Sequence, residues 1–215
     1  MRKDEGEAEV VEVVFRSVVM GGEELNHLVS RLAALYGPGS EIDILEETLV
    51  FHPQKDTGNM NYINREVTVT CEYRSDSFST IKHIGSSIPI IAPTAADEEF
   101  QAYNVRISRA SNINIRRTFL KAGFSLRNDF AKKGLEFVSR IKGLTVFLSR
   151  PYNANLLEAS LYLDGAPSWE TLPGPLPFES DYLLEVKHLI QAQSDVDASV
   201  ALIQKLVSRF SPVSG

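Results

Sequence analysis

The sequence predicts an α+β fold in which a mostly antiparallel sheet of about eight strands is closed, or nearly closed, into a barrel and covered by helices. Three observations predict it. Most apolar residues fall into short alternating runs, as in strands with one covered face. Neighbouring runs are mostly joined in hairpin order, which favours antiparallel pairing. Helical spacing appears only after the first strand, in the middle and at the end, and no linker divides the 215 residues, so we expect a single domain over 1–215.

The N-terminal part supplies one strand and one helix. Residues 1–9 are mostly charged and are expected to form a flexible acidic tail. Residues 10–20 are almost continuously apolar and β-branched, which predicts a strand covered on most of both faces. Leucines at helical spacing over 25–35 then predict a helix that ends at Gly37.

Four further strands are predicted before the middle of the chain, at 42–52, 65–74, 78–84 and 101–108. The alternation is clearest over 65–74, where Val67, Val69 and Cys71 are expected to face a core and the residues between them to face water. A polar loop over 52–64 and a linker over 86–98 connect these strands.

The stretch 111–150 is predicted to be a short helix followed by a three-strand meander. Ile115 and Phe119 share a helical face, and Gly123 follows as the terminating residue. Lys133-Gly134 and Lys142-Gly143 predict two tight reversals between alternating runs.

The last third begins with a long loop or insertion, 151–175, that carries four prolines and two glycines. A strand over 178–190 and a final helix over 194–210 follow. The apolar stripe of this helix is wider than packing on one sheet requires, which is typical of a partner surface. We expect that surface to comprise Val196, Val200, Leu202, Ile203, Leu206, Val207 and Phe210.

Composition limits the function classes. The net charge of −6 and the pI near 5.3 give no basic field for a phosphate backbone, so direct nucleic-acid binding is not expected. No apolar run is long enough for a membrane helix, and the first residues lack the apolar core of a secretory signal. The single cysteine, Cys71, cannot form an internal disulfide.

The central block also resembles a known family. Gly123-Phe124, Phe130, Lys133-Gly134 and Phe137, with a strand ending in Arg150, resemble the subunit 18 family of the Mediator complex. The strand and helix that open the chain, a Leu-Val-Phe strand at 49–51 and the strand order over 67–109 resemble it as well, whereas 151–175 fits poorly.

This resemblance implies a helix-decorated barrel shaped like the tunnel of RNA 5′-triphosphatases. It implies a non-enzymatic subunit of the Mediator head module, a nuclear coactivator that links transcription regulators to RNA polymerase II. The implied partners are Mediator subunit 20, the C-terminal helix of subunit 8, and RNA polymerase II through the head module.

The alternative is a divalent-metal-dependent triphosphate phosphohydrolase of the tunnel type, which needs several glutamates on one face of the barrel. Glu5, Glu7 and Glu9 do alternate, and Glu179 and Asp181 form a second acidic pair, but the first three are assigned to the tail. The first strand itself holds the single acid Glu12. We therefore predict no catalytic, cofactor-binding or metal-binding residues.

Two further observations bear on this prediction. The four histidines lie far apart in sequence, and no nucleophile, phosphate-loop or zinc-helix motif occurs. A barrel that binds a small ligand in its interior stays open, since the sequence does not assign the inward positions.

No pair of acidic residues lies within a strand that the alternating pattern predicts clearly. We therefore predict that the purified protein, supplied with magnesium or manganese, releases no phosphate from triphosphate RNA or nucleoside triphosphates. A phosphate-release assay checks this. Turnover that disappears in a Glu5/Glu7/Glu9 triple alanine variant would defeat the scaffold interpretation.

Overall fold

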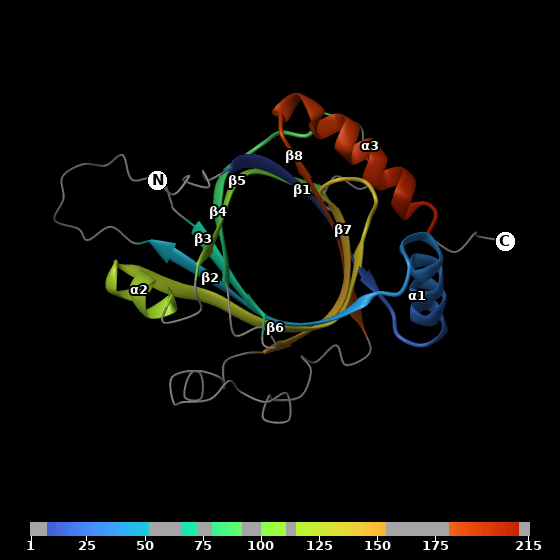
Figure 1. The fold of residues 1–215 in the computed structure, drawn as a ribbon, viewed down its shortest axis with the longest axis horizontal. Coiled ribbons are helices and arrows are strands. Elements are labelled where there is room, and N and C mark those ends of the chain that lie inside the picture. Colours follow the sequence, from blue (N-terminus) through green and yellow to red (C-terminus); the bar gives the residue numbers. More distant parts are fainter. Residues whose placement is uncertain are drawn as a thin grey trace, which may run out of the picture.

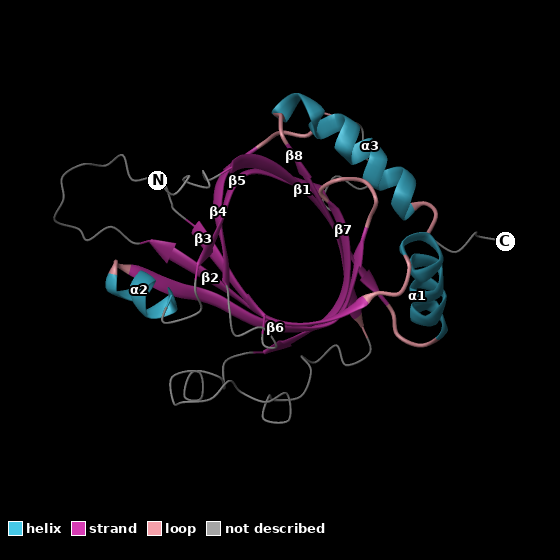
Figure 2. Cartoon of the chain, in the orientation of Figure 1, coloured by secondary structure: helices cyan, strands magenta, loops and turns pink. Residues whose placement is uncertain are grey.

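The computed structural model describes residues 8–51, 66–72, 79–91, 100–110, 115–153 and 181–210. Within these ranges eight strands pair antiparallel in one closed ring, in the order β1-β5-β4-β3-β2-β6-β7-β8, and β8 pairs with β1 to complete it. Figures 1 and 2 show the ring seen nearly end-on, with its helices outside. The predicted class, an antiparallel barrel with covering helices, is confirmed.

The elements follow the predicted order, except that β6 is one strand where two strands of the meander were predicted. The strands are β1 (Ala8–Val19), β2 (Ser40–Phe51), β3 (Glu66–Glu72), β4 (Ser79–Ser87), β5 (Phe100–Ala110), β6 (Phe124–Val138), β7 (Leu144–Asn153) and β8 (Tyr182–Ile190). The helices are α1 (Glu23–Tyr36), α2 (Ile115–Lys121) and α3 (Val196–Val207), with a short 3-10 turn η1 (Gln193–Asp195) before α3.

The main apolar core lies outside the ring, between the strands and two helices. Alternate residues of β1, among them Val11, Val13 and Phe15, belong to one buried cluster with Leu32 of α1 and Ile203 of α3. Figure 1 shows α3 against β8 and β1, and α1 beside β7. The intervening residues of β1 face the interior, so both faces of this strand are covered, as predicted.

The predicted reversal at Lys133-Gly134 is wrong. The chain runs through it as one strand, β6, and Gly134 pairs with Ser149 of β7. A Cβ at Gly134 would overlap the Leu148 carbonyl oxygen, so this glycine permits close approach of two backbones. At Gly143 the predicted reversal is confirmed: its φ of 81° turns the chain from β6 into β7.

Two smaller predictions are also corrected. Glu9 and its neighbour Ala8 belong to β1 rather than to the tail. Thr68, expected to face water, is 5% exposed because its side of β3 faces the barrel interior. Several predicted segments lie outside the described residues: the rest of the tail (1–7), the loop 52–64, most of the linker (92–98) and the stretch 154–175.

The close approach at Gly134 generates a stability prediction. Gly134→Ala places a methyl group against the backbone of β7, and we expect a loss of about 2–4 kcal/mol in the free energy of unfolding. Urea denaturation measures it. Ser125→Ala, at an exposed position of the same strand, is the matched control and should change little; equal effects would contradict the argument.

Candidate functional site

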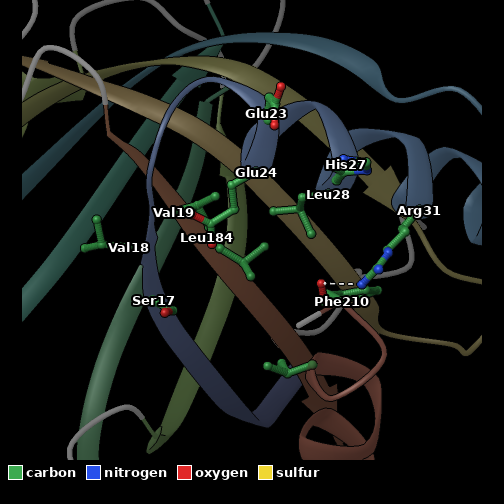
Figure 3. Close-up of a pocket in the computed structure, with 11 residues that line it drawn as sticks. Ser17, Val18, Val19, Glu23, Glu24, His27, Leu28, Arg31, Leu184 and Phe210 are labelled. Carbon is green, nitrogen blue, oxygen red and sulfur yellow. Dashed lines mark hydrogen bonds between the residues drawn. The ribbon is translucent and has the colours of Figure 1, made fainter. Parts of the chain in front are cut away.

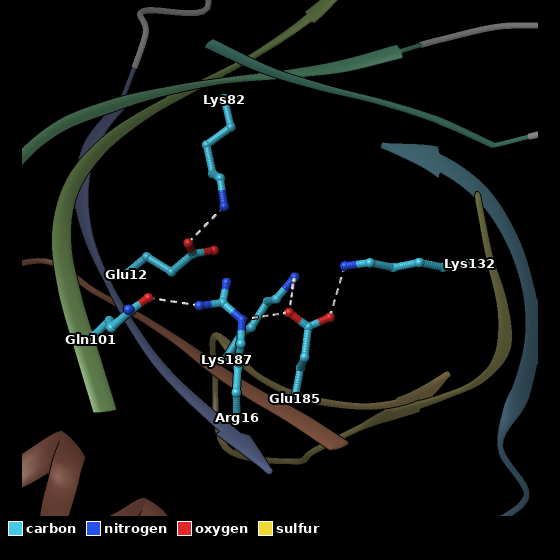
Figure 4. Close-up of polar contacts among 7 residues, drawn as sticks. All are labelled: Glu12, Arg16, Lys82, Gln101, Lys132, Glu185 and Lys187. Atoms are coloured by element: carbon cyan, nitrogen blue, oxygen red, sulfur yellow. Dashed lines mark hydrogen bonds and ion pairs between the residues drawn. The ribbon is translucent and has the colours of Figure 1, made fainter. Parts of the chain in front are cut away.

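The barrel interior holds a group of charged side chains from four strands. Figure 4 shows them pointing toward one another inside the ring. The carboxylates come from β1 and β8, and the cations from β1, β4, β6 and β8: Glu12, Glu185, Arg16, Lys82, Lys132 and Lys187. We call these six residues the interior cluster.

Glu185 is the centre of the interior cluster. Its side chain is 3% exposed, and Lys132 Nζ donates to Oε2 at 3.0 Å, deep inside the ring. Arg16 Nε donates to Oε1 at 3.1 Å, and Lys187 Nζ lies 3.8 Å from the same oxygen. One buried carboxylate therefore holds three cations from three different strands.

The second carboxylate, Glu12, has one cation of its own. Lys82 Nζ donates to Glu12 Oε2 at 2.8 Å, and both side chains are largely buried. Arg16 extends the group by donating from Nη1 to Gln101 Oε1 at 2.7 Å. The interior cluster is rich in cations, and each of its carboxylates already accepts a charge-assisted hydrogen bond.

Electrostatics set the protonation of Glu185. Burial alone would raise the pKa of its carboxyl group, but attraction to Lys187, Lys132 and Arg16 outweighs burial. The pKa of Glu185 therefore lies far below its ordinary value, and the side chain is ionised at neutral pH. Removing one member of these buried ion pairs leaves the charge of the other member uncompensated.

This arrangement does not resemble a metal centre. Divalent cations in tunnel-type chemistry need several carboxylate oxygens free to coordinate them. Here ammonium and guanidinium groups occupy the carboxylates, and no group of three His, Cys, Asp or Glu side chains within the described ranges could hold a metal ion. A metal at either of these two described carboxylates would have to displace Lys82 or Lys132.

Of the acids considered in the sequence, Glu12 lies in the interior cluster and Glu9 does not. Glu9 lies on the outer face of β1, exposed, in a 3.7 Å ion pair with Arg106. Glu5, Glu7 and Glu179 lie outside the described residues, and Asp181 precedes β8.

Sequence reasoning missed Glu185 and its cations. In β8 Glu185 and Lys187 alternate with Leu184 and Val186, a pattern that also fits a solvent-facing side. That alternation was the available signal. Only the closed ring turns the polar side inward and joins it to Lys132 of β6.

Histidines take no part in this cluster within the described residues. His188 of β8 lies 2.9 Å from Ser199 Oγ of α3, ring nitrogen to hydroxyl, and so joins the strand to the helix. Burial lowers the pKa of His188, opposed by a hydrogen bond with the Lys142 backbone. The arrangement is that of a satisfied packing residue.

The predicted partner face of the last helix is mostly turned inward. Five of its seven residues are buried in the chain's own core: Val196, Val200, Ile203, Leu206 and Phe210. These five side chains were predicted to form a partner surface, and their burial within the chain corrects that prediction. Leu202 and Val207 are half-buried, and Val207 lines a cavity at the end of α3.

That cavity, of about 580 Å³, lies between α1, the end of β1, the start of β8 and the end of α3 (Figure 3). We call it the α1–α3 groove. Its apolar lining is Val18, Val19, Leu28, Leu184, Val207 and Phe210. Its polar rim is Ser17, Glu23, Glu24, His27 and Arg31.

One side of the α1–α3 groove is fixed by a link between the helices. Arg31 Nη1 donates to the Phe210 carbonyl oxygen at 2.9 Å, where α3 has just ended. Away from this link Val18, which also lines the groove, is 65% exposed. The groove thus combines an ordered wall with apolar surface open to solvent.

Comparisons with known proteins show similarity of fold. No family model matches the sequence, and no curated protein sequence matches it significantly. A solved chain of the Schizosaccharomyces pombe Mediator head module is similar with a TM-score of 0.61 and 14% identity, over 94% of this chain and 96% of that chain.

Other solved structures share the fold at lower similarity. The mimivirus capping enzyme triphosphatase has a TM-score of 0.51 and 12% identity, over 95% of this chain and 90% of that one. The PH1012 protein from Pyrococcus horikoshii has a TM-score of 0.51 and 13% identity, over 94% and 89%. Both a Mediator chain and an enzyme therefore have this fold.

The buried charge of Glu185 predicts a pH-dependent stability difference. Glu185→Gln leaves three cations without their carboxylate, and we expect it to lower the free energy of unfolding by about 3 kcal/mol at pH 7. Because the folded-state pKa of Glu185 is depressed, its contribution is present above the unfolded pKa of about 4.3 and is lost as the pH falls toward the folded pKa.

Urea denaturation should therefore show a gap between wild type and variant that narrows from about pH 5 downward. Glu9→Gln, which removes an exposed ion pair, serves as the control and should have little effect at any pH. A difference in unfolding free energy that stays constant over this pH range would contradict the depressed pKa of Glu185.

Proposed function

We propose that this chain is a non-enzymatic scaffold subunit of a Mediator head module, and that it acts in the nucleus as part of a coactivator that engages RNA polymerase II. The observation that carries the proposal is the state of the interior cluster: both carboxylates are neutralised by lysine or arginine side chains. Similarity to a head-module chain over nearly the whole length supports it.

The same observation disfavours the tunnel-type phosphohydrolase, which shares the fold. That chemistry requires carboxylates aimed at a metal from inside the barrel. Of the interior carboxylates whose side chains the structure describes, Glu12 is engaged by Lys82 and Glu185 by Lys132. The fold is shared with the enzyme, but Glu12 and Glu185 are engaged in ion pairs. We therefore place the function of this chain on its outer surface.

The α1–α3 groove is the surface we assign to pairing. Its apolar lining and exposed edge suit a partner element with an apolar face, and the acidic rim residues Glu23 and Glu24 favour basic residues beside that face. An amphipathic helix has this combination at i, i+3, i+4 and i+7 spacing. By the family resemblance, the candidates are Mediator subunit 20 and the C-terminal helix of subunit 8.

Two valines of nearly equal exposure make a matched test. Val18 is 65% exposed at the groove and Val138 is 64% exposed at the end of β6. We expect the chain, co-expressed with Mediator subunits 20 and 8 of its own organism, to form a stable complex. Val18→Lys should weaken it by about 2 kcal/mol, whereas Val138→Lys should not.

Analytical ultracentrifugation measures both effects. A chain that stays monomeric beside these subunits at micromolar concentration refutes the Mediator proposal. A complex that tolerates Val18→Lys and is disrupted by Val138→Lys refutes only the placement of the interface.

A further inference from the structure

The turn that joins β6 to β7 lies at the other end of β8 from the α1–α3 groove. Its residues 138–143 read Val-Ser-Arg-Ile-Lys-Gly, and we call them the β6–β7 turn. The Gly143 carbonyl oxygen accepts a hydrogen bond at 2.9 Å from the backbone N–H of Leu189, near the end of β8. The groove is lined by Leu184, near the start of that strand. A partner on the turn would therefore not compete directly for the groove.

Hydrogen bonds within the β6–β7 turn fix its shape. The Ser139 N–H donates to the Leu144 carbonyl oxygen at 3.2 Å, and the Leu144 N–H donates to the Ile141 carbonyl oxygen at 3.1 Å. The Ile141 N–H donates to Ser139 Oγ at 3.0 Å. The backbone of the turn is thus ordered in the free chain, so docking of a partner would order few further groups.

The exposed side chains of the β6–β7 turn are apolar or basic. Val138 is 64% exposed and Ile141 is 42% exposed. Arg140 and Lys142 are exposed as well, and neither has a carboxylate partner within the described residues. On a chain with a net charge of −6, the turn places two unpaired cations beside two open aliphatic side chains.

Charge and apolar surface together select the partner. A carboxylate is attracted to Arg140 and Lys142, and an aliphatic side chain gains by covering Val138 and Ile141. A phosphate backbone would satisfy only the cations, and the chain as a whole lacks the basic field that a nucleic acid requires. A protein segment in which acidic residues alternate with leucines satisfies both kinds of side chain.

We propose that the β6–β7 turn binds an acidic, leucine-containing segment of a partner protein. Carboxylates of the segment would accept hydrogen bonds from Arg140 and Lys142, and its leucines would cover Val138 and Ile141. The inference rests on the proposed scaffold function and extends it. The α1–α3 groove would hold the chain in its complex, and the turn would receive an acidic segment from a different protein, such as a transcription regulator.

Nuclear magnetic resonance on the isolated, methyl-labelled chain tests the proposal. The probe is the blocked peptide acetyl-Gly-Glu-Leu-Glu-Leu-Glu-Gly-amide, with its Gln counterpart as the neutral match. We expect saturable shifts at the methyl groups of Val138 and Ile141. We expect the Gln peptide to bind about fivefold more weakly, because two exposed ion pairs are lost.

Two double variants separate the site from general charge. Arg140→Gln with Lys142→Gln should weaken binding of the Glu peptide about fivefold. Lys121→Gln with Lys205→Gln removes the same charge from exposed positions on α2 and α3, and should bind the peptide as the wild type does.

A charge reversal provides a gain of function that misfolding cannot imitate. Arg140→Glu with Lys142→Glu should lose binding of the Glu peptide and bind the Lys counterpart, acetyl-Gly-Lys-Leu-Lys-Leu-Lys-Gly-amide, which the wild type should not bind at the turn. The shifts of the Val138 and Ile141 methyl groups report both effects.

Equal binding of the Glu and Gln peptides, no shift at the two methyl groups, or equal losses in the turn and control variants overturns the inference. Tighter binding of a uridine decanucleotide or of phosphatidylserine vesicles than of the peptide overturns it too, because the partner would then be a nucleic acid or a membrane. Since the peptide is measured on the isolated chain, this inference can fail while subunit pairing through the α1–α3 groove persists. Loss of subunit pairing with peptide binding intact refutes the Mediator proposal instead.

Discussion

The pairing of β8 with β1 is the constraint on which the rest of the structure depends. It closes eight strands into a ring, so no strand of the ring is left at an edge. Closure also gives every strand an inner and an outer face. The helices can then lie only outside, where α1 and α3 bury one apolar cluster against β1, β7 and β8. The interior is left to the polar side of the alternation.

The interior cluster follows from this closure. Arg16 and Glu185 are Cα partners across the β1–β8 seam, and Lys132 reaches the same carboxylate from β6. The contact between Arg16 and Glu185 exists only when the ring is closed, because it joins the first strand of the chain to the last. An ionised carboxylate surrounded by three cations stabilises one arrangement of the strands and, once occupied, is poorly suited to bind a metal.

Since both carboxylates of the interior cluster are occupied, the outer surface is where we propose that pairing takes place. Helix α1 buries only Leu28 and Leu32 fully, so its flanks stay open on both sides. On one side of α1 is the α1–α3 groove with its acidic rim. None of the helices in the described ranges is long and apolar enough to cross a membrane.

The sequence by itself determined the order and type of the elements, since alternation and helical spacing act between residues near in the chain. It could not distinguish two Lys-Gly pairs: Gly143 turns the chain, whereas Gly134 allows β7 to approach, and the difference depends on the partner strand. It also predicted the apolar stripe of α3 without showing that the barrel wall covers most of it. Only the tertiary structure decided that the polar side of β8 faces inward, because alternation separates two faces of a strand but does not say which one meets water.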